Sequence, residues 1–259
     1  FNKTNINEKL FENSYSLYNS YFPNSEFTNP TNPVIGYNYD SARVWLKEAG
    51  WIMNPSNGKL EKDGKQLEVT LPFTKPMDRY LTIYQEDLQK AGIKLELKET
   101  DMPTRFSLGN ERKFKIIPVQ WMGMLIPNPV SFLSSETADA PGTNNWSGLK
   151  DGRIDSLCKL YDLSYTSEEQ KKVLQEIDKI AYSYFAMIDG FYRSYRSYAF
   201  HNKFGYPDGI TGKYDSFHNI FSYWYIDTDR YEKYQKAVND KSVKLPEEEI
   251  ENKYWRNKK

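Results

Sequence analysis

Apolar and polar residues alternate along two segments of the chain, and a helical spacing connects them. Over Gln66–Phe73 and Ile93–Leu97 every second residue is apolar, which predicts two strands. Between them, Asp78–Lys90 places apolar residues three or four positions apart, which predicts a helix that stops at Gly92. A third strand is predicted over Lys115–Gln120. Strands joined by a helix through short connections predict an open α/β sheet.

Further helices are predicted before, between and after these strands in the sequence. Asp40 is the expected N-cap of the helix Ser41–Ala49. The helix Ser167–Tyr184 is expected to begin with a capping box, formed by Thr166 or Ser167 with Glu169. The predicted helices are Glu8–Ser14, Ser41–Ala49, Arg105–Leu108, Asp151–Leu163, Ser167–Tyr184 and Asp229–Val238. Ala186–Phe200 and Phe221–Ile226 are predicted to be extended, and Pro246–Lys259 to be a charged, mobile or peripheral tail.

The residues after the third predicted strand are the first candidate site. Trp121, Met122 and Gly123 follow that strand directly. In open α/β sheets, ligands gather outside the carboxyl ends of the strands. The pattern therefore indicates a ligand site at this point of the chain.

Composition and charge narrow the classes of function. The 259 residues are enough for one large domain or two modest ones. Lys and Arg number 35 and Asp and Glu also 35, so the formal net charge is zero and gives no drive toward nucleic acid or an anionic membrane. The 21 Tyr, 14 Phe and 6 Trp residues suit wet cores and ligand clefts.

The usual catalytic and metal-binding patterns are absent from the sequence. Cys158 is the single cysteine and lies in an apolar helical pattern, which predicts a buried, inert thiol. No ligand pattern surrounds His201 or His218, so we predict no metal and no other cofactor. Phosphate-binding loops and nucleophile elbows are also missing. Carboxylates are plentiful but no catalytic pair stands out, so the residues favour binding over catalysis.

Several motifs in one order resemble the family 5 extracellular solute-binding proteins, and among them the YejA-like subgroup of microcin C and oligopeptide receptors. One of these motifs is Ala42–Trp51, which reads Ala-Arg-Val-Trp-Leu-Lys-Glu-Ala-Gly-Trp. The others are Leu10-Phe11, Ser20–Glu26, Gly58-Lys59-Leu60, Gly64-Lys65, Tyr84–Ile93, Ala140–Asp151, Arg153–Asp155 and Lys203-Phe204-Gly205. The resemblance covers roughly residues 1–230.

This resemblance implies a type II periplasmic-binding-protein fold and a chain that is a fragment of a longer one. Family members carry a signal peptide and two lobes joined by a hinge. Residues 1–200 are similar to the carboxy-terminal α/β lobe, and residues 201–259 to segments that return to the amino-terminal lobe, ending in a polar tail. We therefore expect Phe1 to lie inside the parent chain, the signal sequence to be absent by truncation, and the location to be periplasmic or extracellular at the membrane surface.

The resemblance also implies where a ligand is held. Receptors of this family pair their strands with the backbone of a peptide between the lobes, and water-filled pockets allow broad specificity. The implied contacts are Gln120, Trp121, Met122 and Gly123 on one wall, Asn144, Asn145 and Trp146 on the next, and Arg105 or Arg112 at a ligand carboxylate. Each has a structural alternative: Trp121 in the core, Asn145 and Trp146 bracing a loop, and the arginines solvated.

One departure from the family pattern concerns the ligand's amine. Dipeptide and oligopeptide receptors place an Asp shortly after the equivalent Trp, whereas Met124-Leu125-Ile126 occupies that stretch here. A free α-amine anchor is therefore in doubt, which allows a modified or longer peptide or another peptide-like metabolite.

The predicted function is the non-enzymatic substrate-binding component of an ABC importer for oligopeptides or peptide-like metabolites. Its predicted partners are the ligand, the transporter permease and the missing amino-terminal lobe, with no nucleic acid. A carbohydrate-active hydrolase and a ligand-sensing module are the alternatives. A hydrolase is expected to have two carboxylates that face the cleft and to turn over a substrate. A ligand-sensing module is expected to have a kinase gene beside its own gene.

Overall fold

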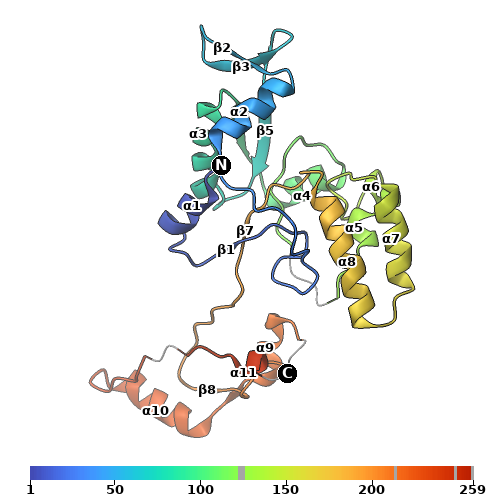
Figure 1. Ribbon diagram of the computed structural model, residues 1–259. Coiled ribbons are helices and arrows are strands. Elements are labelled where there is room, and N and C mark those ends of the chain that lie inside the picture. The colour runs from blue at the N-terminus through green and yellow to red at the C-terminus, as the bar shows by residue number, and fades with distance from the viewer. Residues whose placement is uncertain (122–125, 213–214, 248–249, 258–259) are drawn as a thin grey trace. The chain divides into compact units, whose positions relative to one another are not determined.

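The chain forms two compact units in the computed structural model, which describes residues 1–121, 126–212, 215–247 and 250–257. The units are Phe1–Ser194 and Tyr195–Lys259 (Figure 1). In the described part of the chain, none of the helices combines the length and the apolar character needed to cross a bilayer. The assignment of residues 1–200 and 201–259 to two lobes of a longer receptor is a separate matter and stays a prediction.

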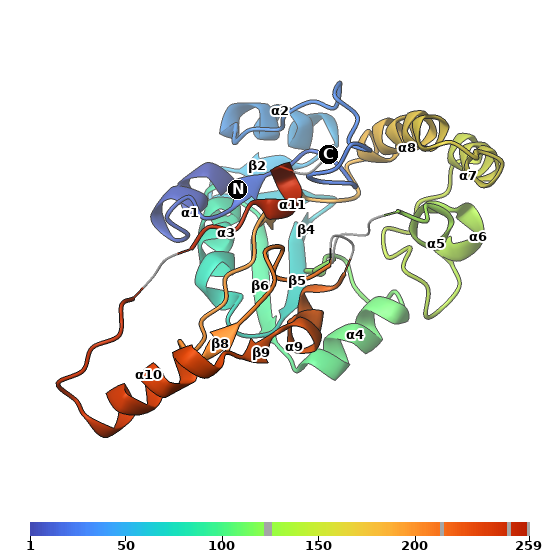
Figure 2. The same cartoon turned by 90° about the horizontal axis from the view of Figure 1, so that it is seen from below.

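A parallel strand pair with its connecting helix forms the α/β centre of the first unit. β5 (Glu68–Phe73) pairs in parallel with β6 (Lys94–Glu99), and α3 (Asp78–Lys90) connects them. Figure 2 shows the two strands side by side with α3 next to them. Leu71 and Leu81 are almost fully buried between strand and helix. The predicted strand–helix–strand unit is confirmed, and α3 has the predicted bounds.

The third predicted strand, Lys115–Gln120, is wrong: the structure has no strand there. Pro118 lies in its middle and has no N–H to donate to a ladder. Its carbonyl oxygen instead accepts a hydrogen bond from Nη1 of Arg105 at 3.1 Å. Ile116 still packs against the apolar residues of β5 and α3. Trp121 therefore follows an irregular segment and not the end of a strand.

An antiparallel three-stranded sheet precedes this centre. Its strands are β2 (Ile52–Asn54), β3 (Lys59–Lys62) and β4 (Lys65–Gln66), in that order. Gly92, which ends α3 with φ +80°, approaches this sheet so closely that a Cβ would lie 3.0 Å from the backbone nitrogen of Leu60. Glycine is therefore required at this position, both because φ is positive and because a side chain would collide with the sheet.

The helix before this sheet starts earlier than its predicted cap. α2 spans Tyr39–Glu48, and the side chain of Asn38 accepts a hydrogen bond from the backbone N–H of Ser41. Asp40 lies inside the first turn, where its charge interacts favourably with the helix dipole. The helix is thus confirmed, while the residue that caps it is corrected.

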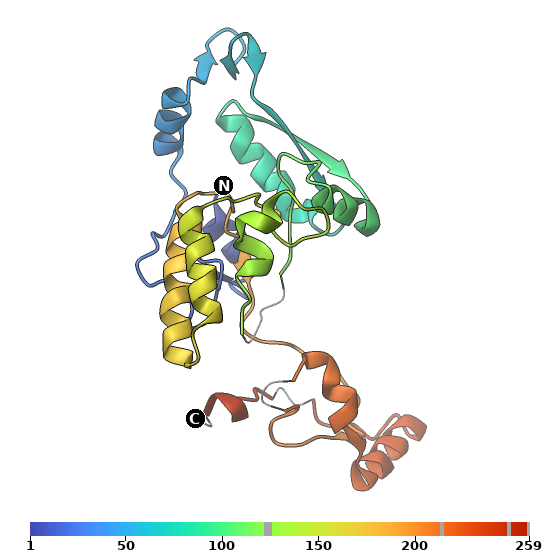
Figure 3. The same ribbon diagram turned by 90° about the vertical axis from the view of Figure 1, so that its right-hand side faces the viewer.

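Four helices of the first unit surround a buried cluster that is separate from that of the α/β centre. α7 and α8 lie side by side in Figures 1 and 3, and α8 begins with the predicted capping box between Thr166 and Glu169. Ile154, Leu174 and Ile177 are completely buried between the helices, and Cys158 is buried as predicted. The helices are α5 (Val130–Leu133), α6 (Ser135–Ala138), α7 (Gly152–Asp162) and α8 (Ser167–Tyr182).

The two ends of the first unit pair with each other. β1 (Ser16–Leu17) and β7 (Phe191–Tyr192) form a short antiparallel ladder. The predicted helix Glu8–Ser14 forms earlier, as α1 (Lys3–Lys9), because Glu12 and Asn13 adopt positive φ values and cannot continue it. Near this ladder, buried Asp189 accepts a hydrogen bond from Tyr182 at 2.6 Å and lies 3.6 Å from Nζ of Lys3.

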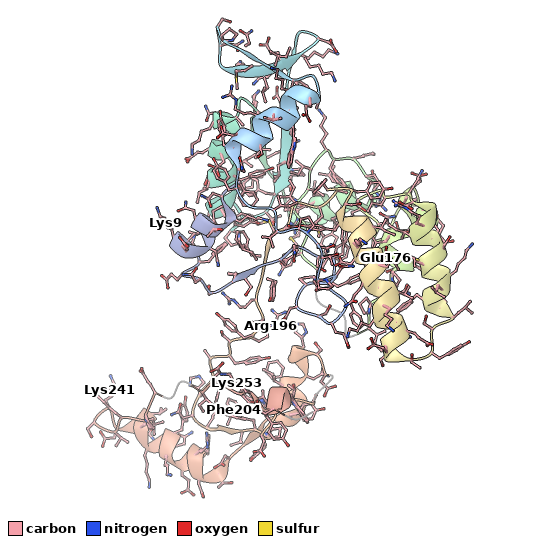
Figure 4. The ribbon with its side chains drawn as sticks, viewed as in Figure 1. Lys9, Glu176, Arg196, Phe204, Lys241 and Lys253 are labelled. Carbon is pink, nitrogen blue, oxygen red and sulfur yellow. The ribbon has the colours of Figure 1, made fainter. Side chains whose placement is uncertain are left out.

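Among its described residues, the second unit has one small antiparallel pair and a cluster of aromatic rings. β8 (Phe204–Gly205) pairs with β9 (Tyr225–Ile226), and Phe200, Phe204 and Tyr206 surround the ring of Trp224; Phe204 is labelled in Figure 4. The predicted strand Phe221–Ile226 is therefore only half correct, because its first part is helical. The remaining elements are η1 (Phe217–Asn219), α9 (Ile220–Tyr223), α10 (Thr228–Asn239) and α11 (Tyr254–Asn257).

The end of the chain is attached to this unit. The indole N–H of Trp255 donates to the carbonyl oxygen of Thr211 at 2.8 Å. The side-chain amide of Asn252 donates to the backbone carbonyl oxygen of Asp208. A Cβ on Gly209 would lie 2.4 Å from the indole nitrogen of Trp255, so this ring rests directly on the backbone of Gly209. Part of the expected tail is thus anchored by specific contacts.

Candidate ligand-binding site

α4 (Met102–Asn110) begins just after the carboxyl end of β6 and organises the surroundings of the candidate site. Asp101 is its N-cap and accepts a hydrogen bond from the backbone N–H of Thr104 at 2.7 Å. Hydrogen bonding from the side chain of Thr104, and then from its backbone, holds the pKa of that carboxyl below its usual value. Arg105 and Phe106 project from the middle of the helix. The short helix predicted over Arg105–Leu108 is confirmed and is longer at both ends.

Four aromatic rings gather next to α4, and we call them the aromatic cluster: Phe106, Phe114, Trp121 and Trp146. Trp146 lies at the centre, with ring centroids 6.0 Å from Phe106, 6.5 Å from Phe114 and 6.1 Å from Trp121. The Trp121 contact is edge-to-face at 62°, a favourable geometry for two ring quadrupoles. Trp121 is 53% exposed and Phe106 50%, so the cluster presents open ring surface to solvent.

A glycine on α4 makes room for the centre of this cluster. A Cβ on Gly109 would lie 2.4 Å from Cη2 of Trp146 and 2.5 Å from Cζ2. No real Cβ contact is that short, so the indole lies directly on the helix backbone. The indole nitrogen is buried and has no hydrogen-bond partner among the described residues.

The two predicted walls meet at Trp121 and Trp146. Gln120, Trp121 and Asn144 are all exposed, and the carbonyl oxygen of Asn144 accepts a hydrogen bond from the backbone N–H of Trp146. Two other predicted residues, Met122 and Gly123, lie outside the described residues. The two sequence-distant segments thus meet through the contact between Trp121 and Trp146.

Asn145 braces a loop and does not face solvent. It is completely buried, and its amide nitrogen donates to the carbonyl oxygens of Ser134 at 3.0 Å and Leu149 at 3.1 Å. Its amide oxygen accepts from the hydroxyl of Ser147. This is the structural alternative raised from the sequence, and it leaves the side chain no free group for a ligand.

Arg105 is buried, contrary to the solvated alternative. It is 6% exposed, and Nη1 donates to the carbonyl oxygen of Pro118. Its other neighbours are thioether sulfurs: Met102 lies 3.0 Å from Nη2 and Met77 3.5 Å from Nη1. Loss of hydration lowers the pKa of this guanidinium.

Arg112 fastens the loop that leads to Trp146. Its Nη1 donates to the carbonyl oxygen of Gly109 at 3.0 Å, and Nη2 lies 2.6 Å from the hydroxyl of Thr143. Nη2 also reaches the carbonyl oxygens of Thr137 and Ala140. The side chain is thereby engaged within the protein, so we do not retain it as a partner for a ligand carboxylate.

Sequence reasoning missed two members of the aromatic cluster, Phe106 and Phe114. The spacing of Phe106 and Gly109, three residues apart on a helix, places a ring beside a gap and could have indicated a ring-packing face. Nothing local identifies Trp146 as its partner. Within the described part of the chain, no three His, Cys, Asp or Glu residues are grouped as a metal site requires.

A family model matches more than half of the chain. Residues 1–144 match the model of the bacterial extracellular solute-binding proteins, family 5 Middle. A curated relative is the "Probable peptide-binding protein YejA" of Agrobacterium fabrum, 24% identical over 188 residues, with 69% of this chain and 31% of the relative covered. The oligopeptide-binding protein AppA of Bacillus subtilis is 25% identical over 154 residues, covering 56% and 28%. The matched parts amount to about a third of the relatives' own length.

Solved structures share the fold. AppA of Bacillus subtilis in complex with a nonapeptide has a TM-score of 0.66 and 20% identity, covering 74% of this chain and 40% of that one. NikZ of Campylobacter jejuni in complex with Ni(L-His) has a TM-score of 0.65 and 21% identity with the same coverage. The expected α/β periplasmic-binding-protein fold and the similarity to the YejA subgroup are confirmed. The chain therefore belongs to the bacterial extracellular solute-binding proteins of family 5.

Proposed function

We propose that this chain is part of the substrate-binding component of an ABC importer and holds oligopeptides or peptide-like metabolites between two lobes. The family and the peptide-binding relatives support this proposal. The observation that carries it is the aromatic cluster, whose exposed Trp121 lies beside the α4 helix that follows the carboxyl end of β6. Ligands of α/β sheets gather at such strand ends.

The proposed contacts are the accessible members of the two walls and the buried Arg105 of α4. Trp121 offers a ring face to an apolar part of the ligand, because it is half exposed and held at one edge by Trp146. Gln120 and Asn144 offer polar groups beside it. The full proposed set is Gln120, Trp121, Met122, Gly123, Asn144, Trp146 and Arg105; Asn145 supports the second wall from behind.

The remaining parts of the proposal concern the whole protein. A permease and the rest of the receptor are its partners, residues 201–259 return to the amino-terminal lobe, and the protein works outside the cytoplasm without catalysing a reaction. The hydrolase alternative is not favoured by the matched family and relatives. Incubation of the purified protein with glycoside substrates tests it, and release of sugar would contradict a binding-only role.

Native mass spectrometry of the full-length protein as purified, followed by titration with an oligopeptide library, tests the proposed function. We expect a carried or titratable peptide-like ligand, and we expect Trp121→Ala to weaken binding about 10-fold or more. Trp45→Ala is the matched control, since Trp45 is 63% exposed on α2 and has no part in the cluster. If no member of the library binds the wild-type protein, the function proposed here is wrong.

A further inference from the structure

Met102 is the most exposed of the methionines that the structure describes. It is the first residue of α4 and is 47% exposed. The other described methionines are all partly buried: Met53, Met77 and Met187. A thioether takes up one oxygen atom to become a sulfoxide, and reductases reverse this step. A small oxidant in solution therefore reaches Met102 more readily than the other three.

Two hydrogen-bond donors already lie against the sulfur of Met102. Nη2 of Arg105, on the same turn of α4, lies 3.0 Å from it. The hydroxyl of Thr74, the residue that follows β5, lies 3.5 Å from it. Arg105 is 6% exposed and Thr74 8%, so both donors are held inside the protein. Because a thioether sulfur is a weak acceptor, these two contacts contribute little as they stand.

A sulfoxide at this position offers the same two donors a stronger acceptor. Methionine oxidation disrupts a core because it makes an apolar side chain polar. Beside Arg105 and Thr74, in contrast, the new oxygen has donors within reach. A hydrogen bond from a charged donor is about twice as strong as one between neutral groups. The sulfur has to withdraw to make room for the oxygen, and an unbranched, half-exposed side chain has the freedom to do so.

We propose that Met102 is a reversible oxidation site, at which Arg105 and Thr74 hold the methionine sulfoxide. Hydrogen peroxide is the oxidant: its O–O bond breaks, one oxygen bonds to the sulfur, and the other leaves as water with both hydrogens. The sulfur loses two electrons and the peroxide gains them. The sulfoxide then connects the first turn of α4 with the residue after β5, so oxidation strengthens this part of the first unit instead of damaging it.

Met77 is an internal comparison, because its sulfur lies beside the same guanidinium. It is 3.5 Å from Nη1 of Arg105, the nitrogen that also donates to the carbonyl oxygen of Pro118 at 3.1 Å. Met77 precedes α3 as its N-cap and is partly buried. We expect it to oxidise later than Met102, because the oxidant reaches it less readily.

Peptide mapping by mass spectrometry, after brief treatment of the purified full-length protein with dilute hydrogen peroxide, gives the order of oxidation. We expect the sulfoxide of Met102 to form about 5-fold faster or more than those of Met53, Met77 and Met187. Formation at the same rate as the other three, or more slowly, would show that Met102 is not an oxidation site, and the inference would be wrong.

Thermal melting of two variants tests whether an oxygen at this position is held. Met102→Gln places an amide oxygen close to where the sulfoxide oxygen would lie, whereas Met102→Leu keeps an apolar side chain that peroxide does not oxidise. We expect Met102→Gln to melt about 2 °C or more above Met102→Leu. After peroxide treatment, the wild type should gain stability relative to Met102→Leu treated in the same way, since all other methionines are common to both.

Two further variants assign this gain to the donors. Thr74→Val removes the hydroxyl, and Arg105→Lys keeps the charge but loses the planar fork of donors. In either background, the advantage of Met102→Gln over Met102→Leu should become smaller. Each comparison is made within one background, so a general loss of stability caused by the background substitution cancels.

Three results would overturn the inference. Met102→Gln could melt no higher than Met102→Leu, or its advantage could persist unchanged in both backgrounds, which would show that neither donor holds the oxygen. Peroxide could also lower the melting temperature of the wild type as much as that of Met102→Leu or more, which would make the sulfoxide ordinary damage. Oxidation rate and stability are the measured quantities throughout, so none of these results bears on the proposed function.

Discussion

Single buried polar side chains hold together segments of this chain that lie far apart in sequence. Asp178 on α8 is completely buried and accepts four hydrogen bonds from the amino-terminal segment. The donors are the hydroxyl of Ser20, the backbone N–H groups of Tyr21 and Asn29, and the amide of Asn32, at 2.7–2.9 Å. Burial raises the pKa of this carboxyl, and the four donors oppose that rise.

We expect Asp178→Ala to destabilise the fold by about 3 kcal/mol or more, because it leaves four donors without an acceptor inside the protein. Denaturant unfolding followed by circular dichroism measures the free energy of unfolding. Asp162→Ala, at an exposed position on α7, is the control and should change it little. Equal effects of the two variants would show that the Asp178 hydrogen bonds contribute nothing to stability.

Asp151 should make the stability depend on pH. The Arg153 side chain and the Tyr184 hydroxyl at 2.6 Å hold the pKa of this carboxyl well below its usual value. A depressed folded-state pKa means that the unfolded chain takes up the proton first as the pH falls. The stabilisation is therefore present above about pH 4 and is lost below it.

Comparison of wild type with Asp151→Asn isolates this charge, because asparagine is also a good N-cap for α7. At pH 7 we expect the variant to be less stable by about 1 kcal/mol. Urea unfolding between pH 2 and 7 gives the difference at each pH. The gap should close below about pH 4, and a gap that is independent of pH would contradict the assignment.

At the scale of elements, α4 connects the α/β centre with the loops that carry the candidate site. It begins after β6, and its Gly109 carries the ring of Trp146. Arg105 holds the segment before Trp121 through Pro118, and Arg112 holds the loop before Trp146. The short helix thus determines where both tryptophans lie.

A methyl group at Gly109 should displace the aromatic cluster. We expect Gly109→Ala to destabilise the fold by about 1–3 kcal/mol through overpacking against Trp146 and to change tryptophan fluorescence. Thermal melting and emission spectra are the measurements. Gly152→Ala is the matched control, since Gly152 is also helical but a Cβ there would meet nothing within 4 Å. Identical behaviour of both variants would show that the ring does not rest on α4.

At the scale of the whole molecule, the two units differ in how much of a core they contain. Every buried hydrophobic side chain of the described residues lies between Ile6 and Tyr182, in the first unit. In the second unit, Gly205 is the one buried residue among those described. The aromatic rings of this unit, such as Trp224 and Phe200, pack against each other but remain partly exposed to solvent.

Expressed separately, the two units should behave differently. Residues 1–194 contain both buried clusters, so we expect a cooperative thermal transition by circular dichroism. Residues 195–259 bury too little apolar surface and should show none. A cooperative melt of 195–259 alone would show that this unit needs no further part of the protein to complete its core.

The sequence by itself determined the elements whose signals are local. The alternation in β5 and β6, the periodicity of α3 and the capping box of α8 lie within a few residues each, and neighbouring residues alone set them. The buried state of Cys158 followed from the same kind of pattern. Together with the order of its motifs, these signals were enough to indicate the fold and the family.

Only the tertiary structure decided the features that depend on distant partners. In the segment before Trp121, the carbonyl oxygen of Pro118 accepts a hydrogen bond from Arg105 and not from a neighbouring strand. Asn145 is internal, and Trp146 meets Gly109 from 37 positions away in the sequence. Such contacts depend on which surfaces the folded chain brings together, and no local spacing records that information.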